Sequence, residues 1–291
     1  MGGGSPLKKW LALLPAFLWL AFLRLGELPP GNENSADAYY HVQMARLFPH
    51  AAMADQFPWT TLSIWENTFY DKELLFHGVV KVLDRLGRAL GFSSEPPFHF
   101  TALALTAWVL ATIWSVARSF RIPAPGWMLF ALAALCPFFS HRMVELRPHL
   151  VSIALMVAFC GWARTYRRTE DLAIACGFGF VMAYAYSNPH FLLLPAVAFA
   201  IAIFPENRRL ASLLPAAVLV GILVGLTFHP QFPNTFRLWK IQCVDVLRES
   251  FSGSRRVFLG GELYRPDALW LVRNGAIFIA LAASVGIFEA L

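Results

Sequence analysis

The chain has 291 residues, of which 57% are hydrophobic and only 14% are charged. Soluble domains usually carry about 25% charged residues, so this composition excludes an ordinary soluble protein and indicates one that crosses a membrane several times. The formal net charge of +6 is accompanied by no basic stripe and no aromatic RNA-binding motif. We therefore expect no nucleic-acid partner and assign Lys and Arg to membrane topology and to anionic membrane lipid. The four cysteines form no CxxC pair, zinc-binding spacing or disulfide framework.

Eight apolar runs approach the length of about 20 residues that a transmembrane helix needs. They lie at 8–28, 98–117, 125–141, 148–163, 172–188, 190–205, 210–228 and 268–288. Within the first run, Lys8 and Lys9 precede the apolar core Trp10–Leu23, and no small-residue cleavage site follows that core, so we expect an uncleaved anchor with a cytoplasmic N-terminus. Every short loop that this topology places in the cytoplasm is basic, as the positive-inside rule requires. The sequence therefore predicts one all-α domain, 1–291, with about eight transmembrane helices.

Two connecting segments are expected on the outer side of the membrane. The first outer loop, 29–97, is too long to be a simple connector and contains two helical patterns, at 37–48 and at 71–90. The second pattern carries an apolar stripe, which is typical of a juxtamembrane helix lying on the membrane surface. The stripe consists of Leu75, Val79, Val82, Leu86 and Leu90. The second outer loop, 229–267, contains a helical pattern at 236–251.

All eight histidines fall on the predicted outer side, at positions 41, 50, 77, 99, 141, 149, 190 and 229. The greater length of the outer loops explains part of this asymmetry, but His149, His190 and His229 lie at span ends, where loop length counts for little. Two of those spans are short: 16 residues separate Arg147 from Arg164, and 16 helical residues cover about 24 Å of a hydrocarbon core of about 30 Å. Polar span ends inside the bilayer are acceptable when they line a water-filled cavity, so the sequence predicts a recessed polar cavity on the outer side.

The stretch SADAYYHVQMAR, at 35–46, places Asp37 and His41 four residues apart, on one helix face. Asp37 is either a helix N-cap beside the interfacial pair Tyr39 and Tyr40, or a carboxylate that takes a proton or ligates a divalent metal such as Mg or Mn. The second helical pattern repeats the spacing. Glu73 and His77 are four apart, with Asp71 two residues earlier. These acids either complement the helix dipole or form a second acidic group facing Asp37.

HRMVELRPHL, at 141–150, carries five ionisable side chains in nine residues. The guanidinium groups of Arg142 and Arg147 suit phosphate oxygens, with His149 beside them, although a rim paired with Glu145 is the alternative. SNPH at 187–190 and FHPQ at 228–231 each place a proline beside His190 or His229, so each is either an unwound cavity edge or a helix terminator. Arg273 lies within the last apolar run, where it either binds phosphate or extends to the interface.

No P-loop, GxGxxG, GxSxG or kinase signature is present, so nucleotide-driven chemistry has no visible site. Group transfer from a lipid-borne donor needs none of these motifs. It needs cations for a phosphate leaving group and a base for the acceptor.

The chain resembles the GT-C superfamily of integral-membrane glycosyltransferases, and within it the N-terminal transmembrane part of oligosaccharyltransferase catalytic subunits. The resemblance covers roughly residues 10–200. Its motifs are DAYYHVQMAR, FPWT followed by IWENTFYDKELLFH, and SHRMVELRPHLVSIALM. It implies that Asp37 is the catalytic acid. The second acidic motif, which in that family binds a divalent metal, is replaced here by Glu145 followed by Arg147, Pro148 and His149. The large C-terminal outer domain is also missing, so the chain is expected to be a truncated form, a fragment or a minimal core of a longer family.

The leading hypothesis is a glycosyltransferase that transfers a sugar from a polyprenyl-phosphate or polyprenyl-diphosphate donor to an acceptor on the periplasmic or extracellular face. Asp37 is its general base or metal ligand. Supporting or metal-binding candidates are His41, Asp71, Glu73, His77 and Glu145. Donor-phosphate candidates are Arg142, Arg147, His149 and Arg273, and further cavity candidates are Tyr39, Tyr40, His190 and His229. A transporter or flippase, and a non-catalytic assembly subunit, are the alternatives; any protein partner is left open.

Overall fold

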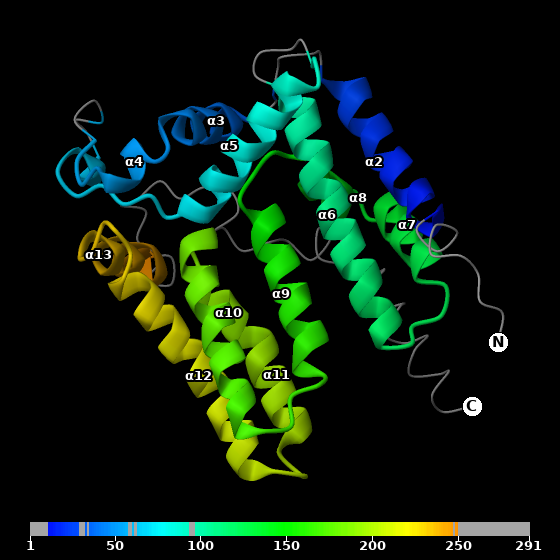
Figure 1. Cartoon of the computed structure of the whole chain (residues 1–291), viewed down its shortest axis with the longest axis vertical. Coiled ribbons are helices and arrows are strands. Elements are labelled where there is room, and N and C mark those ends of the chain that lie inside the picture. The colour runs from blue at the N-terminus through cyan, green and yellow to red at the C-terminus, as the bar shows by residue number, and fades with distance from the viewer. Residues whose placement is uncertain are drawn as a thin grey trace.

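The computed structural model describes residues 11–28, 33, 35–57, 60, 63–92, 97–246 and 248–249. All regular elements within these residues are helical, which confirms the predicted all-α fold class. The helices of the main bundle are α2 (Leu14–Glu27), α6 (Phe98–Ser119), α7 (Pro125–Leu135), α8 (Pro137–Val144), α9 (His149–Ala163), α10 (Leu172–Ala185), α11 (Leu193–Ile203) and α12 (Arg208–Thr227). Two further helices, α3 (Ala36–Leu47) and α5 (Leu74–Ala89), cross one end of these helices, which we call the α3/α5 end (Figure 1).

Short elements complete the described part of the chain. They are the 3₁₀ helices η1 (Leu11–Leu13), η2 (Ile64–Glu66), η3 (Thr169–Asp171) and η4 (Pro189–Leu192), the short helices α4 (His50–Met53) and α13 (Asn234–Lys240), and the π-helix η5 (Ile241–Asp245). The helical pattern expected at 236–251 thus begins at Asn234 and runs on through η5. The remainder of the second outer loop, 251–267, lies outside the described residues.

Two described helices, α6 and α12, are long and apolar enough to cross a membrane, and a third crossing is possible if the bent pair α7 and α8 counts as one span. The shorter apolar helices include α9 and the continuous segment Pro189–Ile203. The chain therefore has the helices of a membrane protein. The count of eight spans stays a prediction, and its last run, 268–288, lies outside the described residues.

The expected span at 125–141 is not straight. Helices α7 and α8 meet at an angle of 95°, and Cys136 between them is extended, with φ −113° and ψ 92°. Pro137 explains the break, because a proline disfavours the helical conformation of the residue before it and cannot continue the backbone hydrogen-bond ladder. The break turns α8, and with it the cluster that begins at His141, toward the α3/α5 end.

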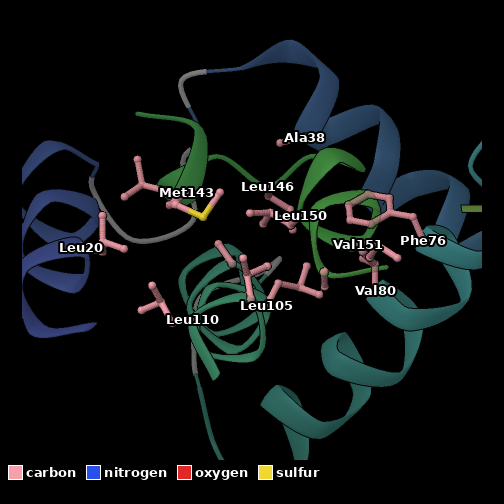
Figure 2. Packing of buried hydrophobic residues seen from close by; sticks show 14 of the residues in the cluster. Leu20, Ala38, Phe76, Val80, Leu105, Leu110, Met143, Leu146, Leu150 and Val151 are labelled. Atoms are coloured by element: carbon pink, nitrogen blue, oxygen red, sulfur yellow. The ribbon is translucent and has the colours of Figure 1, made fainter. Parts of the chain in front are cut away.

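Buried apolar side chains form two main clusters. The first joins α2, α6, α7, α8 and α9 to the inner faces of α3 and α5. Figure 2 shows side chains from α5, α6 and α9 pointing into it, among them Phe76, Val80, Leu105, Leu110, Leu150 and Val151. The second cluster joins α9, α10, α11 and α12. Gly221 lets α10 and α12 approach closely, because a Cβ there would collide with the carbonyl oxygen of Cys176.

Helix α5 buries the face opposite to its predicted apolar stripe. Phe76, His77 and Val80 are fully buried, whereas Val82 in the stripe is 64% exposed. Leu86 and Leu90 are exposed as well. Leu75 and Val79, at the start of the stripe, are partly buried against the core. The exposed remainder of the stripe fits a helix that presents apolar side chains to lipid.

Arg24, near the end of α2, is completely buried. Its Nη2 lies 2.5 Å from Oε2 of Glu33, its Nη1 donates to the carbonyl oxygen of Val144 at 2.5 Å, and its Nε donates to Nδ1 of His99 at 3.3 Å. These bonds tie the end of α2 to the start of α6 and to the end of α8. They hold the segment after Val144, which carries several predicted site residues.

Candidate functional site

Asp37 and Arg147 form an ion pair at the start of α3. Ser35 is the N-cap residue, and Asp37 is the second residue of the helix rather than its cap. The Ser35 hydroxyl makes no capping bond; it accepts hydrogen bonds from Nε and Nη2 of Arg147 at 3.3 and 3.2 Å. Nη2 of Arg147 also lies 2.5 Å from Oδ2 of Asp37. The Asp37 side chain is 57% exposed and that of Arg147 is 28% exposed, so both are accessible from solvent.

Asp71, His77 and His41 form a buried hydrogen-bonded chain next to this pair. Oδ2 of Asp71 lies 2.8 Å from Nδ1 of His77, and Nε2 of His77 lies 2.9 Å from Nδ1 of His41. All three side chains are buried. Oδ1 of Asp71 accepts the backbone N–H of Glu73 at 3.2 Å, which positions the carboxylate at the start of α5.

Gln231 supports the same acid from the segment after α12. Its Oε1 accepts the backbone N–H of Asp71 at 2.7 Å, and its Nε2 donates to the carbonyl oxygen of Ala54. The buried ring of His229 packs edge-on against Tyr70, with ring centroids 4.8 Å apart, and its Nδ1 accepts the Gln231 backbone N–H at 3.2 Å. Burial lowers the pKa of His229 to about 4, and the nearby Asp71 partly opposes this shift.

The charges around His41 show that several segments converge there. Burial is the main cause that lowers its pKa, to about 2, and electrostatic interactions with His77, Lys72, Arg147 and His149 lower it further. His41 is therefore neutral at physiological pH. The ion pair at Asp37, the buried chain and the start of α9 are near enough to interact electrostatically.

Glu73 is a buried acid whose negative charge is only partly balanced by its surroundings. Burial raises the pKa of its carboxyl group; Lys72 and His77 oppose that shift, while Asp71 adds to it. Nζ of Lys72 is 3.8 Å from Oε1 of Glu73, and Oε2 has no hydrogen-bond partner in the described part of the chain. A side-chain hydrogen bond with Ser187 also opposes the shift, and Asp37 is not among the groups that affect this carboxyl.

The 141–150 segment forms a separate cluster. Oε2 of Glu145 lies 3.1 Å from Nη1 of Arg142, and its Oε1 lies 3.3 Å from Nε2 of His141. Nε2 of His149 is 2.6 Å from the carbonyl oxygen of Arg142. Arg142 is thus paired with Glu145, as the rim interpretation expected, while Arg147 turns toward α3.

The remaining candidates have mainly aromatic surroundings. Tyr40 stacks on Trp65 and meets His77 edge-on, with centroids 6.1 and 5.9 Å apart. Tyr39 packs edge-on against Phe98, and its hydroxyl accepts the Glu33 backbone N–H at 3.1 Å.

His190, in η4, contacts the segment formed by α13 and η5. Its Nδ1 is 3.7 Å from Sγ of Cys243, and its ring lies edge-on to Trp239 with centroids 6.2 Å apart. Arg273, the last phosphate candidate, lies outside the described residues.

The structure therefore joins Asp37 to Arg147, and His41 to His77 and Asp71, while Glu145 and His190 belong to other clusters. Sequence reasoning missed Lys72, Gln231 and Ser35. Lys72 lies between the candidate acids Asp71 and Glu73, and Gln231 is the last residue of the FHPQ motif. Their positions beside candidate residues could therefore have pointed to both. Nothing local marked Ser35 as a partner of an arginine 112 residues away.

Within the described ranges, no three side chains of His, Cys, Asp or Glu gather in a way that could hold a metal ion. The one partner of the Asp37 carboxylate seen there is a guanidinium group. The divalent metal implied by the resemblance therefore stays an untested expectation, and the chemistry below involves protein side chains alone. Comparison with known protein families, curated proteins and solved structures finds no match.

Proposed function

We propose that the chain is a GT-C-like membrane glycosyltransferase. It transfers a sugar from a polyprenyl-phosphate or polyprenyl-diphosphate donor to an acceptor. The α3/α5 end faces the periplasm or cell exterior of a bacterial-type inner membrane, and the N-terminus lies in the cytoplasm. The observation that carries the proposal is the accessible Asp37–Arg147 pair, which places an acid and a phosphate-binding cation in direct contact.

Arg147 suits the donor. Its planar guanidinium group, which now bonds Ser35 and Asp37, has the geometry that binds phosphate oxygens in a bidentate manner. A donor phosphate arriving at Arg147 competes with Asp37 for these N–H groups. Donor binding thereby releases the carboxylate for the acceptor, which couples the two halves of the reaction.

In the transfer step, the acceptor oxygen forms a bond to the anomeric carbon of the sugar while the bond from that carbon to the phosphate oxygen breaks. The bonding electron pair leaves with the phosphate, and the acceptor proton passes to Asp37. Arg147 stabilises the charge that develops on the leaving phosphate, and Lys72 is a further cation that acts electrostatically on the neighbouring His41.

Transfer of a radiolabelled sugar from a polyprenyl-phosphate donor, measured with the full chain in proteoliposomes, tests the proposal. Asp37→Asn should lower the rate by about 10²–10⁴-fold, the usual contribution of a general base. Arg147→Gln should raise the KM for the donor. Asp55→Asn changes an exposed acid in the same loop and should leave the rate unchanged. Undiminished transfer by Asp37→Asn would overturn the role of Asp37, and no transfer by the wild type from mono- or diphosphate donors would overturn the function itself.

A further inference from the structure

The hydrogen bonds that join Asp71, His77 and His41 have a defined direction from donor to acceptor. The Asp71 carboxylate accepts hydrogen bonds: Oδ1 takes the Glu73 N–H, and Oδ2 lies opposite Nδ1 of His77. Nδ1 of His77 must therefore carry a proton. We take the His77 ring as neutral, with this single N–H, so that its Nε2 is an acceptor.

The same limit of one N–H for each neutral imidazole determines the proton position on His41. Nδ1 of His41 lies 2.9 Å from Nε2 of His77, so the His41 nitrogen is the donor. Because His41 is neutral, its own Nε2 is left with a lone pair and no proton. The carboxylate of Asp71 thus sets the proton positions on two rings in series, as a buried acid orients a histidine in a catalytic triad.

The outer nitrogen of His41 has no hydrogen-bond partner among the described residues. His41 remains 5% exposed, and its Nε2 is neither hydrogen-bonded to another described residue nor among the buried polar atoms that lack a partner. Neighbouring rings hold the imidazole in place: Phe76 lies edge-on to it with centroids 5.0 Å apart, and Tyr40 does so at 5.3 Å. His41 follows Asp37 by one helical turn, on the same face of α3.

We propose that Nε2 of His41 is a ligand-binding acceptor that takes a hydrogen bond from a hydroxyl group of the bound sugar. Asp71 and His77 are positioning residues that set the proton on His41. The identity of the ligand rests on the proposed function, whereas the proton arrangement does not. A hydroxyl bound at His41 lies beside a phosphate bound at Arg147, so the two residues together select a phosphate that carries a sugar.

The variant Asp71→Asn should reverse the direction of the hydrogen bonds that join residue 71, His77 and His41. The amide oxygen can keep the hydrogen bond from the Glu73 N–H, which directs the amide NH₂ group toward Nδ1 of His77. Nδ1 then becomes an acceptor, the proton of His77 moves to Nε2, and this nitrogen donates to Nδ1 of His41. The proton of His41 moves in turn to its outer Nε2, which can no longer accept a hydrogen bond from a hydroxyl.

The tautomers can be read from the ¹⁵N shifts of the imidazole nitrogens in ¹⁵N-histidine-labelled full-length protein at neutral pH, in a sugar-free detergent. His41→Gln and His77→Gln assign the two rings, and His50→Gln, an exposed position, is the control. We expect both rings protonated at Nδ1 in the wild type and at Nε2 in Asp71→Asn. Wild-type rings protonated at Nε2, a charged His77, or unchanged tautomers in a folded Asp71→Asn would overturn the proposal. If that variant does not fold, the wild-type spectrum by itself tests the predicted tautomers of His41 and His77.

Binding supplies the second measurement, with farnesyl phosphate and farnesyl-phosphate-linked glucose as probes. The wild type should bind the glucose-bearing lipid about 3- to 10-fold more tightly than the phosphate alone, which is the effect of one neutral hydrogen bond. Asp71→Asn should lose that preference yet bind farnesyl phosphate as the wild type does, whereas Arg147→Gln should bind both lipids more weakly. A preference retained by Asp71→Asn contradicts the role of His41. If the wild type binds neither lipid, the proposed function fails, and the tautomers still decide the proton arrangement.

Discussion

Replacing the buried Arg24 by methionine should strongly destabilise the fold. The substitution removes the guanidinium partner of Glu33 at 2.5 Å and the donor to the Val144 carbonyl oxygen. Removing one partner from a buried ion pair typically costs about 3–5 kcal/mol, a large share of a net stability of about 5–15 kcal/mol. The segment that begins at Val144 should also lose its anchor.

The double variant Arg24→Met/Glu33→Leu distinguishes the cost of leaving one charge unpaired from the cost of altered packing. Replacing both members of a buried pair by apolar side chains is often nearly neutral, because no charge then has to be buried. We therefore expect Arg24→Met and Glu33→Leu each to be destabilising, and the double variant to be more stable than either single variant. Additive losses would refute this reasoning.

Unfolding by SDS in mixed micelles, followed by far-UV circular dichroism, measures these free energies. Arg46→Met replaces an exposed arginine in the last turn of α3 and should change the free energy of unfolding by less than about 0.5 kcal/mol. A loss equally small for Arg24→Met would show that the buried pair contributes little.

Two further predictions concern Glu73 and the contact between α10 and α12. Burial raises the pKa of Glu73 above its ordinary 4.5, so the native state binds a proton more tightly than the unfolded state, and wild-type stability falls as pH rises above that value. Glu73→Gln should therefore gain stability relative to the wild type between pH 4 and pH 7 in the same unfolding assay, and a difference independent of pH would contradict the shift. Gly221→Val should cost about 1–3 kcal/mol, because its Cβ collides with the Cys176 carbonyl oxygen; Gly177→Ala, whose Cβ meets nothing within 4 Å, is the matched control and should not destabilise.

The sequence by itself determined the helical character of the chain and the approximate position of most described elements. Apolar runs and helical periodicity are local properties, since they follow from neighbouring residues and from the need to satisfy backbone hydrogen bonds in lipid. The helix α5 shows this: its pattern was expected at 71–90, and the structure places it at Leu74–Ala89. The same reasoning singled out Asp37, His41 and His77 as chemically unusual, although it paired Asp37 with His41 and Glu73 with His77 along each helix.

The tertiary structure decided which of these side chains meet. Asp37 is bound by an arginine 110 residues away, His41 by a histidine 36 residues away, and the backbone of Asp71 by Gln231, at a separation of 160 residues. A helical pattern defines a face but not the neighbour that the face packs against. The proton direction along Asp71, His77 and His41 exists because α3 and α5 pack together at the end of the bundle, and no single segment of the chain contains that information.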